Sequence, residues 1–131
     1  FMMAYDRVGA SPDCGGTYDL PRLLGPRRAA QFYLLSETLQ ADEALAIGLI
    51  NRVVAADALA AETQKWADKI ASGPTRAFGH YKRLIGQSYA TPLSEQLEAE
   101  REAFKASTRS EDFRSGVLAF TSKQPSSFRG R

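Results

Sequence analysis

The residues best suited to chemistry lie in a turn near the start of the chain, which reads VGASPDCGGT over residues 8–17. A Pro-Asp pair followed by two glycines is typical of a turn that leads into a helix. Asp13 in this turn has two interpretations. Its carboxylate can cap the helix by accepting backbone N–H bonds. Alternatively, it can face a ligand as a general base, because glycines let the backbone approach closely.

Cys14 is the second candidate, and together with His80 it makes up the chain's entire content of Cys and His. A thiolate at a helix N-terminus is a nucleophile, but a small buried thiol is the simpler interpretation. A Cys-His pair or a Ser-His-Asp triad would have to use His80, which we interpret as a surface or packing histidine. One Cys and one His exclude a disulfide framework and a zinc site of the usual ligand type within the chain, so no metal is expected.

Near the other end of the chain, Phe120 and Lys123 lie three residues apart and share one face of a predicted helix. One interpretation is a core phenylalanine with a lysine that complements the helix C-terminus. The other is an aromatic–cation pair that holds a nucleotide base and a phosphate. The spacing alone leaves both open.

Composition limits the classes of protein that fit. The chain has 131 residues, 44% of them hydrophobic, and a formal net charge of +2, which predicts one globular domain rather than a disordered chain. No apolar run is long enough to predict a membrane span. Residues 71–131 carry ten basic and six acidic side chains, too weak and unclustered a charge for nucleic-acid binding. The expected compartment is the reducing cytoplasm.

Most of the chain is predicted to be helical, with short strands only at residues 1–5 and 50–55. The first of these reads as an apolar strand entering a core, so we expect the natural polypeptide to extend upstream of Phe1. Glycines and prolines mark the helix boundaries. Helices are expected to begin after Gly16, at Pro26, at Gln40, before Leu59, at Pro74, at Pro92 with Thr91 as cap, and after a capping box over residues 108–111.

The helices of the second half have apolar faces at helical spacing. One set of such residues is Leu59, Trp66 and Ile70, and another is Leu93, Leu97 and Phe104. Two short strands offer these faces little to pack on. We therefore expect the helices to pack on each other, on upstream residues, or on another subunit.

Three blocks of this sequence resemble the crotonase (enoyl-CoA hydratase/isomerase) superfamily, in the family's order and spacing over essentially the whole chain. They are DLPRLLG at the end of residues 1–25, ADEA and GLINRVV within residues 41–54, and GVLAF at residues 116–120 with Lys123, Pro125 and Phe128. The resemblance implies an α/β fold, a spiral of ββα turns followed by helices, of which this chain is the mostly α-helical second half. Residues 1–56 would end the spiral core and carry the active-site turn, and residues 57–131 would form a helical trimerisation region. The resemblance also implies a homotrimer or a hexamer made of two trimers.

The resemblance also implies a reaction. Family members stabilise a thioester enolate with a pair of backbone N–H groups, here expected upstream, while a carboxylate moves a proton or activates water. Hydratases carry a catalytic Glu four residues after the position of Phe1, where this chain has Tyr5, a poor base when neutral. Asp13 matches a catalytic Asp of some isomerases and of the dehalogenases. An isomerase-like protein is implied, with Asp13 as base and acid in a 1,3-proton shift.

Phe120 and Lys123 match positions that contact the adenine and phosphate end of coenzyme A, often from a neighbouring subunit. The implied partner is an acyl-CoA substrate, with no cofactor beyond its CoA and with neither nucleic acid nor membrane. Glu37 stands where the family usually has Gly and is interpreted as a loop variant.

Other functions remain open. Within the family they are hydration, thioester hydrolysis and C–C cleavage. From another class, the chain can be a non-catalytic oligomerisation or CoA-binding module. A general helical interaction domain leaves the turn at residues 8–17 and the C-terminal block unexplained. The 131-residue chain alone is expected to have little or no activity.

Overall fold

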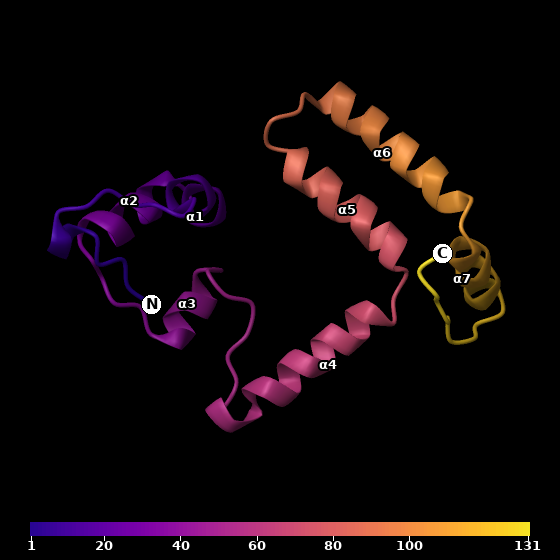
Figure 1. The fold of residues 1–131 in the computed structure, drawn as a ribbon, viewed down its shortest axis with the longest axis horizontal. Coiled ribbons are helices and arrows are strands. Elements are labelled where there is room, and N and C mark those ends of the chain that lie inside the picture. The colour runs from indigo at the N-terminus through magenta and orange to yellow at the C-terminus, as the bar shows by residue number, and fades with distance from the viewer. The chain divides into compact units, whose positions relative to one another are not determined.

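The structure is a computed structural model that describes all residues, 1–131. The chain forms two compact units, Phe1–Asp57 and Ala58–Arg131, built from helices and their connections (Figure 1). The helices of the first unit are η1 (Asp6–Val8), α1 (Gly16–Leu24), α2 (Pro26–Leu34) and α3 (Ala41–Ala46), and η2 (Ala56–Ala58) ends at the second unit. The second unit contains α4 (Leu59–Ala71), α5 (Thr75–Gln87), α6 (Leu93–Thr108) and α7 (Glu111–Thr121).

No strand is present, so the prediction of strands at residues 1–5 and 50–55 is wrong. Phe1 and Leu39 exchange backbone hydrogen bonds of 2.8 Å in both directions. This pairing does not continue into a ladder, and the N–H of Ile50 turns back toward the carbonyl of Ala44 at 3.4 Å. A strand exists only where a neighbour pairs with it, and apolar β-formers do not supply that neighbour.

The first unit is organised around α1 and α2. Gly25 ends α1 with a φ of 78°, which is open to glycine, and Pro26 then occupies the first turn of α2. This boundary confirms the sequence prediction. The buried core consists of Leu20, Ala29 and Phe32, and α1 is thereby fixed with its N-terminus directly after the turn at residues 8–15.

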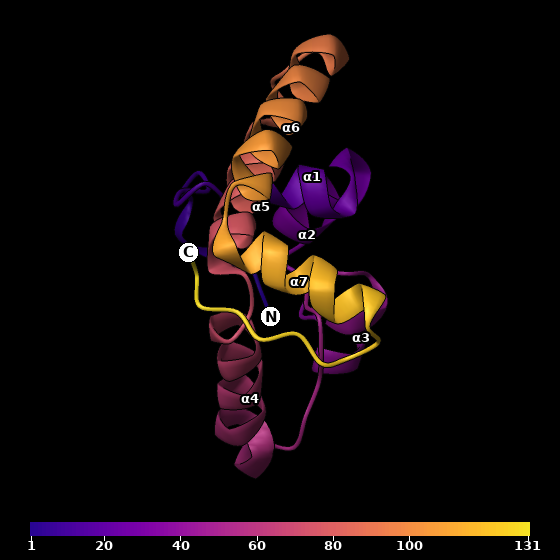
Figure 2. The same cartoon turned by 90° about the vertical axis from the view of Figure 1, so that its right-hand side faces the viewer.

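In the second unit, α5 and α6 lie side by side in both Figure 1 and Figure 2. Gln96 of α6 donates a hydrogen bond of 3.1 Å to the carbonyl of Leu84 in α5. The prediction that Thr91 caps α6 is wrong, because Pro92 takes the N-cap position. The Thr91 hydroxyl instead donates to the carbonyl of Gln87 at 2.9 Å, at the end of the preceding helix.

The start of α7 also differs from the predicted capping box. The cap is Ser110, whose hydroxyl accepts a 3.0 Å bond from the N–H of Phe113, so the pattern at residues 108–111 identified the wrong cap. Asp112, in the same turn, is buried and accepts backbone N–H bonds from Arg129 at 2.7 Å and Gly130 at 2.8 Å. Figure 2 shows the C-terminal segment running back along α7. We call this set of bonds to Asp112 the tail clasp.

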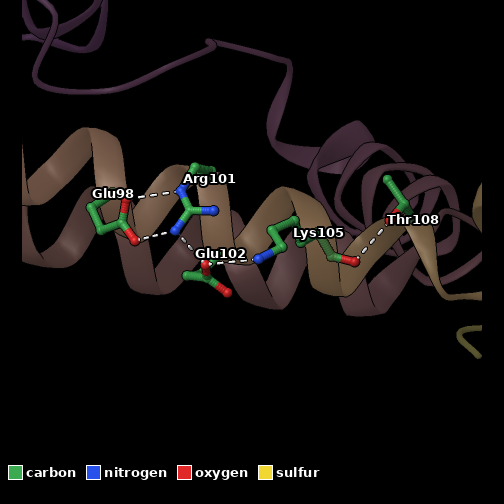
Figure 3. A network of polar contacts seen from close by, with 5 residues as sticks. All are labelled: Glu98, Arg101, Glu102, Lys105 and Thr108. Carbon is green, nitrogen blue, oxygen red and sulfur yellow. Dashed lines mark hydrogen bonds and ion pairs between the residues drawn. The ribbon is translucent and has the colours of Figure 1, made fainter.

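The solvent face of α6 carries a chain of polar contacts (Figure 3). Arg101 binds Glu98 and also Glu102, the latter at 2.8 Å, and Lys105 lies 3.2 Å from Glu102. The guanidinium of Arg101 lowers the pKa of Glu98. All four side chains are at least half-exposed, so solvent screens these pairs and they contribute little stability.

The predicted packing faces of α4 and α6 stay exposed within this chain. Trp66 and Ile70 on α4 are 45% and 57% exposed, and Phe104 on α6 is 63% exposed. Isolated exposed apolar residues are ordinary, but a row of them along a helix marks a surface that contacts something else. No helix combines the length and apolar character needed to cross a bilayer.

Candidate functional site

The turn at residues 8–15 is folded back toward Tyr5. The short helix η1 ends at Gly9 with a φ of 64°, and the N–H of Ala10 bonds to the carbonyl of Tyr5 at 3.0 Å. Cys14 and Gly15 then have φ values of 52° and 80°. Two successive left-handed residues reverse the chain into α1 and leave Asp13 facing Tyr5.

Asp13 does not cap α1, so the capping interpretation of this residue is wrong. Gly15 occupies the N-cap position without a side-chain hydrogen bond, and its carbonyl accepts the N–H of Asp19 at 3.0 Å. The carboxylate of Asp13 is exposed, and its Oδ1 accepts a 2.6 Å hydrogen bond from the hydroxyl of Tyr5. The side chain is therefore available to a ligand while one of its oxygens is held.

Hydrogen bonds shift the pKa of the Asp13 carboxyl. The Tyr5 hydroxyl, and after it the Cys14 thiol, lower the pKa of Asp13 below its ordinary value. The same contacts raise the pKa of Tyr5 and of Cys14. At neutral pH Asp13 is thus an anion between two protonated neighbours. This disfavours Cys14 as a thiolate nucleophile, and Cys14 is exposed rather than the buried thiol expected from the sequence.

Tyr33 of α2 packs behind the turn. Its ring centroid lies 6.3 Å from that of Tyr5, and its hydroxyl is buried with no hydrogen-bond partner. Burial, followed by the charge of Asp13, raises the pKa of Tyr33. A Cβ on Gly16 would overlap the Tyr33 oxygen and lie 3.4 Å from the Cζ of its ring. Only glycine fits at the start of α1 beside this phenol.

Replacing Gly16 with alanine is therefore expected to destabilise the whole protein by about 1–3 kcal/mol, as overpacking does. In a Tyr33→Phe background the clashing oxygen is gone, and the substitution should become neutral or gain up to ~1 kcal/mol from helix propensity. Urea unfolding of the four variants measures both effects. Gly79→Ala is the matched control, because nothing lies within 4 Å of its added Cβ. If Gly16→Ala lowered the free energy of unfolding equally in both backgrounds, the contact between Gly16 and the Tyr33 hydroxyl would be contradicted.

The second pair of candidate residues, Phe120 and Lys123, lies at the end of α7. Phe120 is 85% exposed, so it is not part of a core formed within this chain. Lys123 follows the helix with a φ of 54°, and its N–H bonds to the carbonyl of Phe120 at 3.2 Å. Both side chains are exposed and can meet a ligand.

Next to Phe120 is a cavity of about 330 Å³ within the second unit. Its walls include Arg76 and His80 of α5 together with the rings of Phe113 and Phe128. The Nδ1 of His80 accepts a 2.7 Å bond from Arg83, since a guanidinium only donates. The described side chains include no cluster of three or more His, Cys, Asp or Glu that could hold a metal.

Sequence reasoning identified Asp13 but missed two residues that act on their surroundings. Tyr5 was interpreted only as the residue that stands where hydratases of the family carry a catalytic glutamate. In the structure its hydroxyl donates the hydrogen bond to Asp13. Asp112 was not singled out from the sequence, and its carboxylate holds the C-terminal segment. No local signal pointed to Asp112, because the N–H groups that bond to it belong to Arg129 and Gly130, in the C-terminal segment beyond the far end of α7.

Comparison with known proteins places the whole chain in one family. The family model described as enoyl-CoA hydratase/isomerase matches residues 1–131. The chain is 39% identical over its full length to 1,2-epoxyphenylacetyl-CoA isomerase of Escherichia coli K12, and 34% identical over 92% of its length to crotonyl-CoA hydratase of Syntrophomonas wolfei. It covers 50% and 46% of these two relatives.

A solved structure of enoyl-CoA hydratase/isomerase from Cupriavidus metallidurans CH34 superposes with a TM-score of 0.92 at 31% identity. The match covers 99% of this chain and 49% of that one. The chain thus spans about half the length of the proteins it matches and shares the crotonase fold over that part. It belongs to the enoyl-CoA hydratase/isomerase family.

Proposed function

We propose that the whole protein isomerises an enoyl thioester of coenzyme A and that Asp13 moves the proton. The observation that carries this proposal is the exposed Asp13 carboxylate, which accepts a 2.6 Å hydrogen bond from the hydroxyl of Tyr5. Two relatives named as isomerases support an isomerase over a hydratase: 1,2-epoxyphenylacetyl-CoA isomerase at 39% identity and trans-2-decenoyl-[acyl-carrier-protein] isomerase at 30%. The family resemblance supports the residue, since some isomerases carry a catalytic Asp at this position.

The proposed step is a balanced 1,3-proton shift. Asp13 takes the proton from C2 of a 3-enoyl thioester, and the electron pair of that bond passes to the thioester oxygen as an enolate. The proton is then returned at C4, and the double bond moves to C2–C3. Because Asp13 is ionised beforehand, it acts first as a base and then as an acid. No cofactor beyond the substrate's CoA takes part.

The enolate oxygen needs preorganised N–H donors, because negative charge develops on it as the proton leaves and must be stabilised without rearrangement of solvent. The family resemblance assigns these donors to the part of the relatives' length that this chain does not span. We therefore assign to this chain the proton-moving carboxylate and a share of CoA binding, and to the whole protein the turnover.

Hydration is the second candidate, and a relative named crotonyl-CoA hydratase favours it. Against it stands Tyr5, at the position where the resemblance would require a glutamate. Its pKa is raised, chiefly by the bond to Asp13, so the phenol stays protonated to higher pH than a free tyrosine and cannot serve as the base near neutrality. Water activation would then fall to Asp13 alone.

Product analysis of the whole protein tests the proposal. A 3-enoyl-CoA substrate should be converted to the conjugated 2-enoyl-CoA, and 2-enoyl-CoA should gain water far more slowly. Rapid hydration without isomerisation would favour the hydratase. Binding of both thioesters without turnover would favour the non-catalytic module.

We propose that Phe120 and Lys123 bind the adenine and a phosphate of CoA. Their exposure supports this, and so does the φ of 54° at Lys123. A left-handed lysine costs about 1 kcal/mol or more relative to glycine. Where a strained residue is kept, a functional constraint is a reasonable hypothesis.

Lys123→Gly should accordingly have two effects of opposite sign. The free energy of unfolding should rise by about 1 kcal/mol as the strain is relieved, and KM for the thioester should rise roughly tenfold as a charged contact is lost. Denaturant unfolding and steady-state kinetics of the whole protein measure the two. The control is Lys105→Ala, on the solvent face of α6, which should change the free energy of unfolding and KM only slightly. An unchanged KM in Lys123→Gly would remove Lys123 from the binding site.

We further propose that the exposed apolar faces of α4 and α6 contact other subunits in a homotrimer or a dimer of trimers. Trp66, Ile70 and Phe104 support this, because they form rows along their helices and stay 45–63% exposed in this chain.

A further inference from the structure

The contact between Tyr5 and Asp13 is anchored at both ends. The carbonyl of Tyr5 accepts the N–H groups of Val8 at 3.2 Å and Ala10 at 3.0 Å, which fixes its backbone. Its ring packs against Tyr33 with an interplanar angle of 52°. Tyr33 in turn is packed against the buried core of the first unit. The phenol is therefore a rigid donor rather than a mobile surface side chain.

Asp13 lacks packing of this kind, and its other hydrogen-bond donor is the thiol of the adjacent Cys14. Asp13 is exposed, lies in a turn, and does not bond to the start of α1 through its side chain. Without a partner its carboxylate would sample several rotamers. The 2.6 Å bond from Tyr5 occupies Oδ1 and leaves Oδ2 without a tyrosine contact. The Cys14 thiol also hydrogen-bonds this carboxylate, so Tyr5 is the more distant in sequence of two donors that orient it, and the side chain stays exposed to a ligand.

We propose that Tyr5 is a positioning residue, which orients the Asp13 carboxylate so that it can accept the substrate proton. This inference rests on the proposed function, since it concerns the same carboxylate. Tyr5 does not itself exchange a proton with the substrate. The titratable groups that face Asp13 are Tyr5, Cys14 and Tyr33. All three stay protonated at neutral pH, so the carboxylate carries the charge.

Tyr5→Phe isolates the hydroxyl, because the ring that packs on Tyr33 is retained. A hydrogen bond to a charged group is stronger than one between neutral groups, so kcat for isomerisation should fall roughly 10- to 100-fold while KM changes little. The pKa of Asp13 should rise toward its ordinary value, because the strongest group lowering it is removed. The acid limb of kcat/KM should move to higher pH by the same amount.

The control is Tyr33→Phe, which removes a hydroxyl that has no partner. It should leave kcat and the acid limb nearly unchanged. The denaturant concentration at the midpoint of unfolding should be nearly the same for both variants and the parent, which separates positioning from a general loss of structure. A purely structural role for Tyr5 would lower stability without moving the pH profile.

The decisive experiment is an NMR titration of the Asp13 carboxyl in the whole protein without substrate, compared between wild type and Tyr5→Phe. A raised carboxyl pKa together with a reduced kcat supports the inference. An unchanged carboxyl pKa overturns it, and so does an unchanged kcat. Asp13→Asn keeps the two hypotheses apart. If Asp13→Asn abolishes turnover and Tyr5→Phe has no effect, only the positioning role fails. If Asp13→Asn is fully active, the proposed function fails with it.

Discussion

Asp13→Asn is expected to lower kcat for isomerisation by roughly 100- to 10,000-fold, the usual contribution of a general base. An amide is nearly the same size as a carboxylate and still accepts the Tyr5 hydrogen bond, so the turn should keep its shape. What disappears is the lone pair that takes the proton. Steady-state assays with a 3-enoyl-CoA measure kcat, and KM should change by less than a factor of about three because no binding contact is removed.

Asp19→Asn is the matched control for this variant. Asp19 lies six residues further on in the first turn of α1, is also exposed, and is not the partner of the Tyr5 hydroxyl. Its kcat should equal that of the parent. If Asp13→Asn and Asp19→Asn both turn over at the parent rate, Asp13 is only a surface partner of Tyr5 and another group moves the proton.

The second large effect concerns the tail clasp. Asp112→Ala should lower the free energy of unfolding by about 3 kcal/mol, because a buried carboxylate that accepts two backbone N–H bonds is removed. Amide hydrogen exchange at Arg129 and Gly130 should accelerate strongly as their acceptor is lost. Denaturant unfolding and hydrogen exchange of the whole protein measure the two consequences.

Glu111→Ala is the neighbouring control. Its carboxylate pairs with Arg131 at 3.1 Å, but both side chains are more than 60% exposed, so the cost should stay below ~1 kcal/mol. Equal destabilisation by the two variants would show that Asp112 contributes no more than a surface charge. The clasp also keeps Phe128 near Gly116, where an added Cβ would lie 3.3 Å from its ring. Its loss should therefore loosen the wall of the cavity beside Phe120.

The helix boundaries were predictable because glycine and proline act locally. The Gly25–Pro26 junction needs only a positive φ at one residue and a fixed φ at the next. The N-cap residues of the helices were harder to predict, because neighbouring serines and threonines can each occupy the same N-cap position. Ser110 was preferred over Thr108, whose hydroxyl bonds back to the carbonyl of Lys105 at 2.8 Å within α6.

The absence of a strand at residues 1–5 could not be predicted from the sequence. Strand formation depends on a pairing partner, and no local pattern specifies one. The exposure of Phe120 is a similar case. Its helical spacing indicates a face, but the spacing cannot say what, if anything, covers that face.

The candidate site was predictable in part. A Pro-Asp-x-Gly-Gly turn and the family resemblance identified Asp13. The contact with Tyr5 was not predicted, because it requires left-handed backbone at Cys14 and Gly15 to bring residues eight apart together. The change of Asp13 from a cap to a held, ionised carboxylate follows from that one backbone reversal.

The measurement that most directly tests the central claim, that Asp13 removes a proton from the substrate, is solvent deuterium exchange. The whole protein and its Asp13→Asn variant are incubated in D₂O with a 3-enoyl-CoA, and the thioester is analysed by NMR. Asp13 is exposed, so its proton exchanges with solvent, and the wild type should place deuterium at C4 of the product and C2 of recovered substrate. The variant should do so at least ~100-fold more slowly while still binding the thioester. Equal exchange rates would contradict the claim, because the proton would then be taken by another group.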